Sequence, residues 1–145
     1  MSEIDPNLLR DIIMDHYQYP RNHQLSEEPS YQSKHMASES CIDDITVQVK
    51  FDQDRIEDVR FDGQACTIST ASTSIMSELV KGKTKEEANE IIRNYFSMID
   101  QKEYDEDLLE EAIAFQNVGK QANRINCATI GWKALRDMIK ESEGK

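Results

Sequence analysis

The sequence has little of what several classes of protein require. Only five of its 145 residues are glycine and three are proline, and aromatic residues make up 7%, which excludes collagen-like and low-complexity chains. No apolar run approaches the roughly 20 residues of a membrane-spanning helix. Positive charge is also scarce, because 17 lysines and arginines stand against 28 acidic residues and give a net charge of −11. We therefore expect no binding to nucleic acid or to an anionic membrane, since both attract basic surfaces.

Cysteine is scarce as well, and its count is odd. Three cysteines do not suit the even-numbered disulfide framework of a small secreted domain. The first residues, MSEID, are acidic and lack the cationic and apolar stretches of a signal peptide. These absences together predict a reducing compartment, the cytoplasm. The length predicts a single domain over residues 1–145.

The pattern of the first half predicts one helix and a small sheet. Asp5 and Pro6 are typical of a helix start, and Pro20 ends the helix. Residues 21–40 are polar and irregular, which predicts a flexible arm or loop. Apolar and polar residues then alternate, as they do in the half-buried strands of an antiparallel sheet. The strands are predicted at 45–51 and 56–61, with a further short strand or bulge at 64–66.

The second half predicts helices, because apolar residues recur there at intervals of three and four. Thr84 and Glu87 form a capping-box pattern at the start of one of them. The last helix is predicted from about Cys127 to Lys140. Since the strands come early and the helices late, we expect an α+β fold: a small antiparallel β-sheet of about three strands with helices packed on one face.

Each cysteine lies at a predicted junction between elements. Cys41 and Asp43 are two residues apart at the entrance to the first strand, so both should point to one side, with Asp44 on the other. Cys66 lies between a strand end and a helix start. Cys127 lies at the predicted start of the last helix, a position that favours a thiolate. Three thiolates and a carboxylate would complete a tetrahedral zinc site, but the spacing alone leaves open that the cysteines only pack in the core.

Three segments carry a family likeness in their order along the chain. They are residues 11–22 (DIIMDHYQYPRN), 61–72 (FDGQACTISTAS) and 124–135 (RINCATIGWKAL). Over nearly its whole length the chain resembles the U-type iron–sulfur cluster assembly family, which comprises IscU, SufU and the N-terminal domain of NifU. The likeness is greatest to the SufU branch. The interval between Cys66 and Cys127 is long, Asn126 replaces the histidine typical of IscU, and the LPPVK motif of IscU is absent.

The resemblance implies a SufE/NifU-like fold and a metal site made by four residues. These are Cys41, Asp43, Cys66 and Cys127. In SufU-type proteins the site holds Zn²⁺, and the protein acts as a sulfurtransferase that takes persulfide sulfur from a SufS-like cysteine desulfurase. The sulfur then passes to downstream cluster assembly proteins or apo-protein acceptors. Cys41 is expected to be the attacking thiolate, because its loop follows the predicted arm. Arg124 is expected to lie over the site, where it would pair with Asp43 or steer the persulfide.

Other functions stay open at this point. The first alternative is a scaffold on which a [2Fe–2S] cluster is assembled and passed on, as in IscU-type proteins. The second is a non-catalytic zinc-binding interaction domain, and the third is a metal-free interaction module. Ile42 stands where the family motif has glycine, so we expect an altered approach of the desulfurase to Cys41. His16 is expected to be a structural residue of the first helix, whereas His23 and His35 should be solvated.

Overall fold

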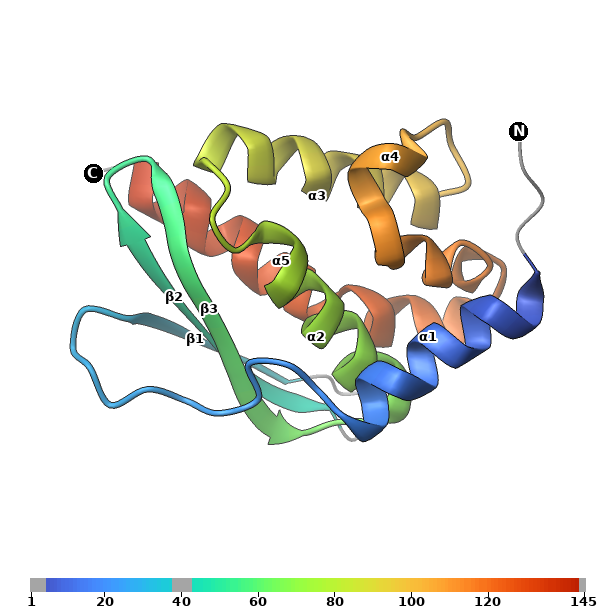
Figure 1. Ribbon diagram of the computed structural model, residues 1–145, viewed down its shortest axis with the longest axis horizontal. Coiled ribbons are helices and arrows are strands. Elements are labelled where there is room, and N and C mark those ends of the chain that lie inside the picture. Colours follow the sequence, from blue (N-terminus) through green and yellow to red (C-terminus); the bar gives the residue numbers. More distant parts are fainter. Residues whose placement is uncertain (1–4, 38–42, 144–145) are drawn as a thin grey trace.

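The structure, a computed structural model, describes residues 5–37 and 43–143. Among these residues, β1 (Gln32–Ala37), β2 (Asp44–Asp52) and β3 (Arg55–Gln64) form one antiparallel sheet in the order β1-β2-β3. The helical elements are α1 (Pro6–Gln18), α2 (Thr67–Val80), α3 (Lys85–Ile99), α4 (Glu106–Leu109), the 3₁₀ helices η1 (Glu110–Phe115) and η2 (Val118–Lys120), and α5 (Ala122–Glu143). Helices α2 and α5 pack on the sheet, and α1 and α3 pack against these two helices (Figure 1). The predicted α+β fold is confirmed.

The β2–β3 hairpin follows from the alternation of apolar residues along both strands. Val47 lies opposite Phe61 in the register, and both side chains are buried between the sheet and the helices. Residues facing the other way are polar, which is the pattern of a sheet with one covered face. The predicted strands at 45–51 and 56–61 are confirmed, and each is slightly longer than predicted.

The prediction of a loop over residues 21–40 is wrong for residues 32–37, which form β1 and pair with β2 at the edge of the sheet. The side chains of this strand are mostly polar and exposed, and only Lys34 and Met36 are half-buried. An edge strand with so little buried surface shows no apolar alternation. The signal that identified the other two strands was therefore missing here.

The loop before β1, residues 21–31, is held against the sheet by hydrogen bonds. The Ser26 N–H donates to Gln48 Oε1 (2.6 Å), and Gln48 Nε2 donates to the Ser26 carbonyl (3.0 Å). The Tyr31 hydroxyl donates to Asp58 Oδ2 (2.5 Å). Partial burial alone would raise the pKa of Asp58, but hydrogen bonds from Tyr31 and two basic neighbours outweigh burial and hold the pKa below its usual value. The segment is thus tied to β2 and β3 at several points.

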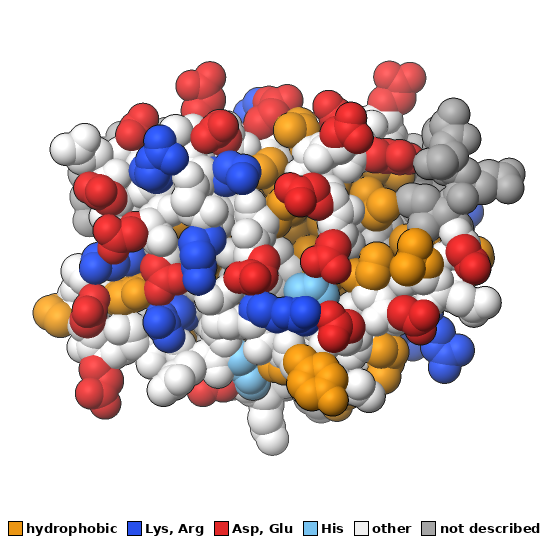
Figure 2. Space-filling model, viewed as in Figure 1, with side chains coloured by type: hydrophobic (Ala, Val, Ile, Leu, Met, Phe, Trp, Pro, Cys, Tyr) orange, Lys and Arg blue, Asp and Glu red, His pale blue; other side chains and the backbone are white. Residues whose placement is uncertain are grey.

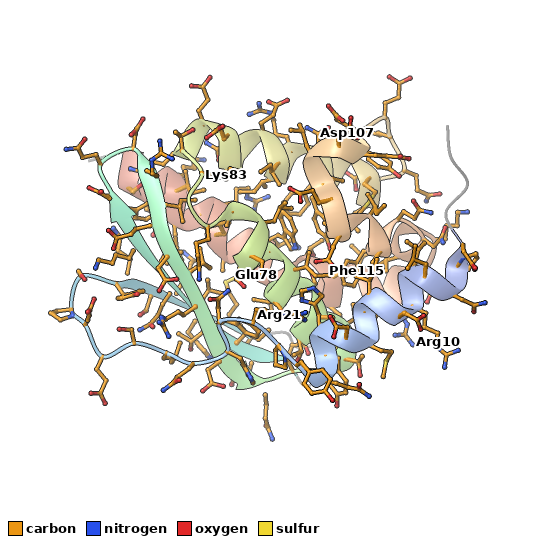
Figure 3. The ribbon with its side chains drawn as sticks, in the orientation of Figure 1. Arg10, Arg21, Glu78, Lys83, Asp107 and Phe115 are labelled. Carbon is orange, nitrogen blue, oxygen red and sulfur yellow. The ribbon has the colours of Figure 1, made fainter. Side chains whose placement is uncertain are left out.

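Helix α1 is fixed to the domain through His16, which is 1% exposed. Its Nδ1 lies 2.8 Å from Ser74 Oγ of α2, and its Nε2 lies 3.2 Å from a Glu111 carboxylate oxygen of η1. Ser74 Oγ also accepts the backbone N–H of Arg21 (2.9 Å), where the chain leaving α1 passes α2 (Figure 3). His16 therefore has the structural role that the sequence predicts.

Helix α2 is buried along most of its length, although it is rich in serine and threonine. Ser72 Oγ donates to the Ala128 carbonyl of α5 (2.6 Å) and accepts the indole N–H of Trp132 (3.0 Å). The Tyr95 hydroxyl donates to the same carbonyl (2.7 Å), and its ring stacks on Trp132 at a centroid distance of 3.8 Å. These bonds satisfy the buried polar groups of Ser72, Tyr95 and Trp132 and fix α2 to α5.

The helix starts were predicted with mixed success. Asp5 caps α1 by accepting the Asn7 N–H (2.9 Å), and Thr84 with Glu87 forms the capping box of α3, so both of these predictions are confirmed. The predicted start of the last helix at Cys127 is wrong, because α5 begins at Ala122.

The reason for the error in α5 lies in its first turns. Arg124 and Asn126 are exposed, and Cys127 is the first well-buried residue of the helix among those whose side chains are described. Apolar periodicity marks only the part of a helix that packs on a core. Cys127 is therefore in the second turn of α5 and not at its N-terminus. The expectation that a helix N-terminus favours a thiolate applies to Cys66 instead.

The contact of α2 with α5 contains one buried polar atom without a partner among the described residues, Thr73 Oγ1. A β-carbon added at Gly131 would lie 2.5 Å from it. Thr73→Val replaces this hydroxyl with a methyl group of similar shape, so we expect the free energy of unfolding to rise by about 1–2 kcal/mol. Urea unfolding measures the change. Gly131→Ala should lower the free energy of unfolding. A Thr73→Val variant that is less stable than the native chain would show that the Thr73 hydroxyl is bonded.

Acidic side chains are spread over the face of the molecule that Figure 2 presents, without gathering in one patch, and lysines and arginines are interspersed among them. Within residues 5–37 and 43–143, no helix has both the length and the apolar content needed to cross a bilayer.

Candidate metal centre

The ends of three elements meet at one point of the domain. Asp43 immediately precedes β2, Cys66 is the N-cap of α2, and Cys127 lies in the second turn of α5. One carboxylate oxygen and the two sulfur atoms all lie within 4.8 Å of one another. A tetrahedral zinc ion with bonds of about 2.3 Å to sulfur holds its ligand atoms about 3.8 Å apart. The structure thus brings together three of the four predicted ligands, and the fourth, Cys41, lies outside the described residues.

Gly63 allows β3 to approach the start of β2 at this site. It has a φ of +130°, and a β-carbon at this position would lie 2.1 Å from the Asp44 carbonyl oxygen. Gly63 pairs with Ile45 in the register, so the close approach occurs beside Asp43. A glycine within a strand often marks such an approach of two backbones. The predicted strand or bulge at 64–66 is wrong, because β3 ends at Gln64 and the chain passes directly into α2.

Cys66 connects the sheet to α2. Its backbone N–H donates to Asp43 Oδ1 (2.8 Å). Its sulfur accepts the backbone N–H of Ser69 (3.4 Å), as the side chain of an N-cap residue does. The positive end of the helix dipole favours negative charge on this sulfur. The predicted place of Cys66, between a strand end and a helix start, agrees with the structure.

The site is largely closed to water. Asp43 is 2% exposed and Cys127 is 6% exposed, whereas Cys66 is half-buried. Asp44, the next residue after Asp43, is exposed on the other side of the strand, as predicted. Burying a carboxylate beside two thiols costs free energy unless the charge of the carboxylate is compensated. Two sulfur atoms and one carboxylate oxygen are ligands that zinc accepts, and thiolates also bind iron, so the donor set fits a metal ion of this type.

Ser69 belongs to the site, although it is not among the site residues predicted from the sequence. It is fully buried, and its hydroxyl contacts Asp43 Oδ2 and lies 2.9 Å from the Cys127 carbonyl oxygen. The signal available in the sequence was its spacing, three residues after Cys66, which places the two residues on one side of a helix start.

Arg124 is exposed in the first turn of α5. It lines a cavity of about 420 Å³ together with Arg10 of α1 (Figure 3) and with Thr67, the residue after Cys66. The cavity places its side chain on the α1 side of the start of α2. The predicted pairing of Arg124 with Asp43 stays a prediction.

The histidines lie outside the three-ligand cluster of the described residues. His23 Nε2 lies 3.2 Å from Asp62, and His35 Nε2 lies 2.5 Å from Asp44. Both histidines are partly or largely exposed on the sheet side of the domain, as expected for solvated residues.

Comparisons with known proteins agree on one group of relatives. Residues 8–145 match the model of the NifU-like N-terminal domain family. The chain is 39% identical over 138 residues to the zinc-dependent sulfurtransferase SufU of Bacillus subtilis, a match that covers 94% of this chain and 92% of that protein. It is 37% identical over 137 residues to the iron–sulfur cluster assembly scaffold protein IscU of Streptococcus pyogenes, covering 94% of this chain and 85% of that protein.

Solved structures give the same result for the fold. A crystal structure from Fervidobacterium islandicum, of a protein assigned as an iron–sulfur cluster assembly scaffold of the SUF system, has a TM-score of 0.79 and 36% identity, covering 87% of this chain and 92% of that one. The N-terminal part of a NifU-like protein from Brucella abortus has a TM-score of 0.83 at 21% identity, with coverages of 92% and 93%.

Proposed function

The chain belongs to the NifU-like N-terminal domain family, and from this premise we propose that it is a zinc-binding iron–sulfur cluster assembly protein that accepts persulfide sulfur from a cysteine desulfurase. The observation that carries the proposal is the convergence of Asp43, Cys66 and Cys127 within 4.8 Å. The zinc-dependent sulfurtransferase of B. subtilis, which is similar over 94% of the chain, supports it further.

Four residues would hold the zinc ion. Asp43, Cys66 and Cys127 are already grouped, and Cys41 precedes Asp43 by two residues, a span of at most about 7 Å along the chain. When bound, zinc keeps cysteine thiols deprotonated at neutral pH. The ligand set of three sulfur atoms and one oxygen atom suits zinc and leaves the thiolates as the nucleophiles of the site.

Burial favours Cys41 as the residue that accepts sulfur. Cys127 is 6% exposed and lies within a helix, so another protein cannot easily reach it. Cys66 is half-buried, and its sulfur accepts a hydrogen bond as the cap of α2. Both of these cysteines are held by regular structure that a transfer reaction would have to disturb.

The transfer itself is a thiolate exchange. The Cys41 thiolate attacks the outer sulfur of the persulfide on the desulfurase, the sulfur–sulfur bond of that persulfide breaks, and the cysteine of the desulfurase leaves as a thiolate. Cys41 then carries the sulfur to a cluster assembly protein or an apo-protein. Meanwhile the Cys66 N–H holds Asp43 Oδ1 at 2.8 Å, so the carboxylate stays in place. Arg124, near the start of α2, would steer the anionic persulfide.

The test uses protein purified without chelators. We expect about one zinc ion per chain and a colourless solution, and we expect the protein to raise cysteine-dependent alanine release by a SufS-like desulfurase. Cys41→Ala should abolish this increase. A protein without zinc, or one that binds zinc but leaves alanine release unchanged, would contradict the proposal. A brown protein with iron and sulfide in equal amounts would contradict the proposal and support a [2Fe–2S] scaffold instead; the S. pyogenes relative is named an iron–sulfur cluster assembly scaffold protein.

A further inference from the structure

We propose that Ser69 is a positioning residue of the metal centre, which holds the Asp43 carboxylate in its ligating orientation at the point where α2 meets the segment of α5 that carries Cys127. This inference rests on the proposed function, because it concerns the same site. Ser69 is the third residue of α2 and is fully buried.

One side chain here contacts all three of the described ligand residues. The Ser69 hydroxyl donates to Asp43 Oδ2 and lies 2.9 Å from the Cys127 carbonyl oxygen. The sulfur of Cys66 lies 3.6 Å from the same hydroxyl, and the Ser69 backbone N–H donates to that sulfur. Each contact belongs to a different element, so Ser69 lies where the start of β2, the cap of α2 and the second turn of α5 meet.

The two oxygens of Asp43 are held by two different donors. Oδ1 accepts the Cys66 N–H at 2.8 Å, and Oδ2 accepts the Ser69 hydroxyl. Hydrogen bonds to an ionised carboxylate are stronger than those between neutral groups. Removing the Ser69 hydroxyl takes away a donor to Oδ2, so the orientation of the carboxylate would be less firmly fixed. A ligand that must be reoriented before it binds lowers the affinity for the metal.

The hydroxyl also has a second acceptor for its single hydrogen atom. When Asp43 Oδ2 is withdrawn, the hydroxyl can turn to the Cys127 carbonyl oxygen, which already lies at 2.9 Å. The buried donor therefore stays satisfied whether or not Asp43 is in its ligating position. Leaving a buried donor unpaired would be costly, so this second acceptor eases the exchange of the carboxylate at the site.

Ser72 provides a matched control on the same helix. It is also a buried serine, and it donates to the Ala128 carbonyl at 2.6 Å, the carbonyl next to that of Cys127. Its other partners among the described residues are Tyr95 and Trp132, none of which is a proposed ligand. Ser69→Ala and Ser72→Ala thus each remove a buried serine hydroxyl between α2 and α5, but only Ser69→Ala removes a bond to the side chain of a proposed ligand.

The experiment measures zinc affinity by competition with a chromophoric chelator, and the visible spectrum of the Co²⁺-substituted protein, for the native chain and three variants. We expect Ser69→Ala to weaken zinc binding about 10–100-fold and to shift the Co²⁺ bands. Ser69→Thr keeps a hydroxyl and should stay within about threefold of native affinity. Ser72→Ala should bind zinc as the native chain does, although urea should unfold it more easily.

Results other than these would contradict either the role of Ser69 or the proposed function, and the two cases can be told apart. If the native chain binds zinc and Ser69→Ala matches it in affinity and spectrum, the role of Ser69 is wrong while the proposed function stands. If Ser72→Ala loses as much affinity as Ser69→Ala, or if Ser69→Thr is as weak as Ser69→Ala, the effect comes from helix packing and the role is again wrong. A native chain without zinc would overturn the proposed function, and the role of Ser69 with it.

Discussion

Replacing Cys127 by serine should reduce the zinc content from about one ion per chain to nearly none, because a serine hydroxyl is not deprotonated at neutral pH and is a poor ligand for zinc. Cys127 is 6% exposed and lies within a helix, so a neighbouring side chain cannot easily move into its place. Stimulation of the desulfurase should disappear with the metal. Metal analysis after dialysis and alanine release measure the two effects.

Thr129→Ser is a suitable control for this substitution. Thr129 lies two residues further along α5, and its hydroxyl donates to the Ile125 carbonyl within the helix (2.7 Å), so serine keeps that bond. This variant should retain zinc. A chelator should lower the melting temperature of the native chain and of Thr129→Ser, but leave Cys127→Ser unchanged, because bound zinc contributes its binding free energy to folding. Full zinc content in Cys127→Ser would contradict the ligand assignment.

Gly63→Ala should destabilise the protein by about 3 kcal/mol or more, since it combines backbone strain with an overlap between two strands. The added β-carbon would lie 2.1 Å from the Asp44 carbonyl oxygen, and relief of that overlap must move the start of β2. Asp43 would move with it, so zinc affinity should fall as well. Urea unfolding and chelator competition measure both changes.

Gly82→Ala tests the backbone strain of a positive φ without the steric overlap expected at Gly63. Gly82 also has a positive φ, of +85°, but a β-carbon there would meet nothing within 4 Å. This variant should lose only about 1–2 kcal/mol and should bind zinc normally. Equal losses at Gly63 and Gly82 would show that the strands can separate at Gly63 without effect on the site.

What the sequence predicts well is what short-range patterns determine. The alternation that places Val47 and Phe61 in the core marks the β2–β3 hairpin, and the capping box of Thr84 and Glu87 marks the start of α3. Both patterns reflect burial or capping within a few residues. Neither pattern identifies the edge strand β1, because its side chains are mostly polar and exposed.

The site is only partly predictable for the same reason. Residue chemistry and the family resemblance identify candidate ligands such as Asp43 and Cys66 without any knowledge of their distance. The contact of Ser69 with Asp43 joins residues 26 positions apart, and its contact with the Cys127 carbonyl joins residues 58 positions apart. The close approach at Gly63 depends on the register of two strands. Contacts of this length are decided by tertiary packing, which no local pattern contains.

The long separations within the metal centre also set the moment at which it can form during synthesis. Asp43 and Cys66, 23 positions apart, can meet as soon as the β2–β3 hairpin and the start of α2 have folded. The contact of Ser69 with α5 must wait until a chain segment 58 residues further on has left the ribosome. At about 5–20 residues per second, that interval lasts several seconds. During it, Asp43 and Cys66 lie together without Cys127, so the growing chain would gain full zinc affinity only after α5 has docked against α2.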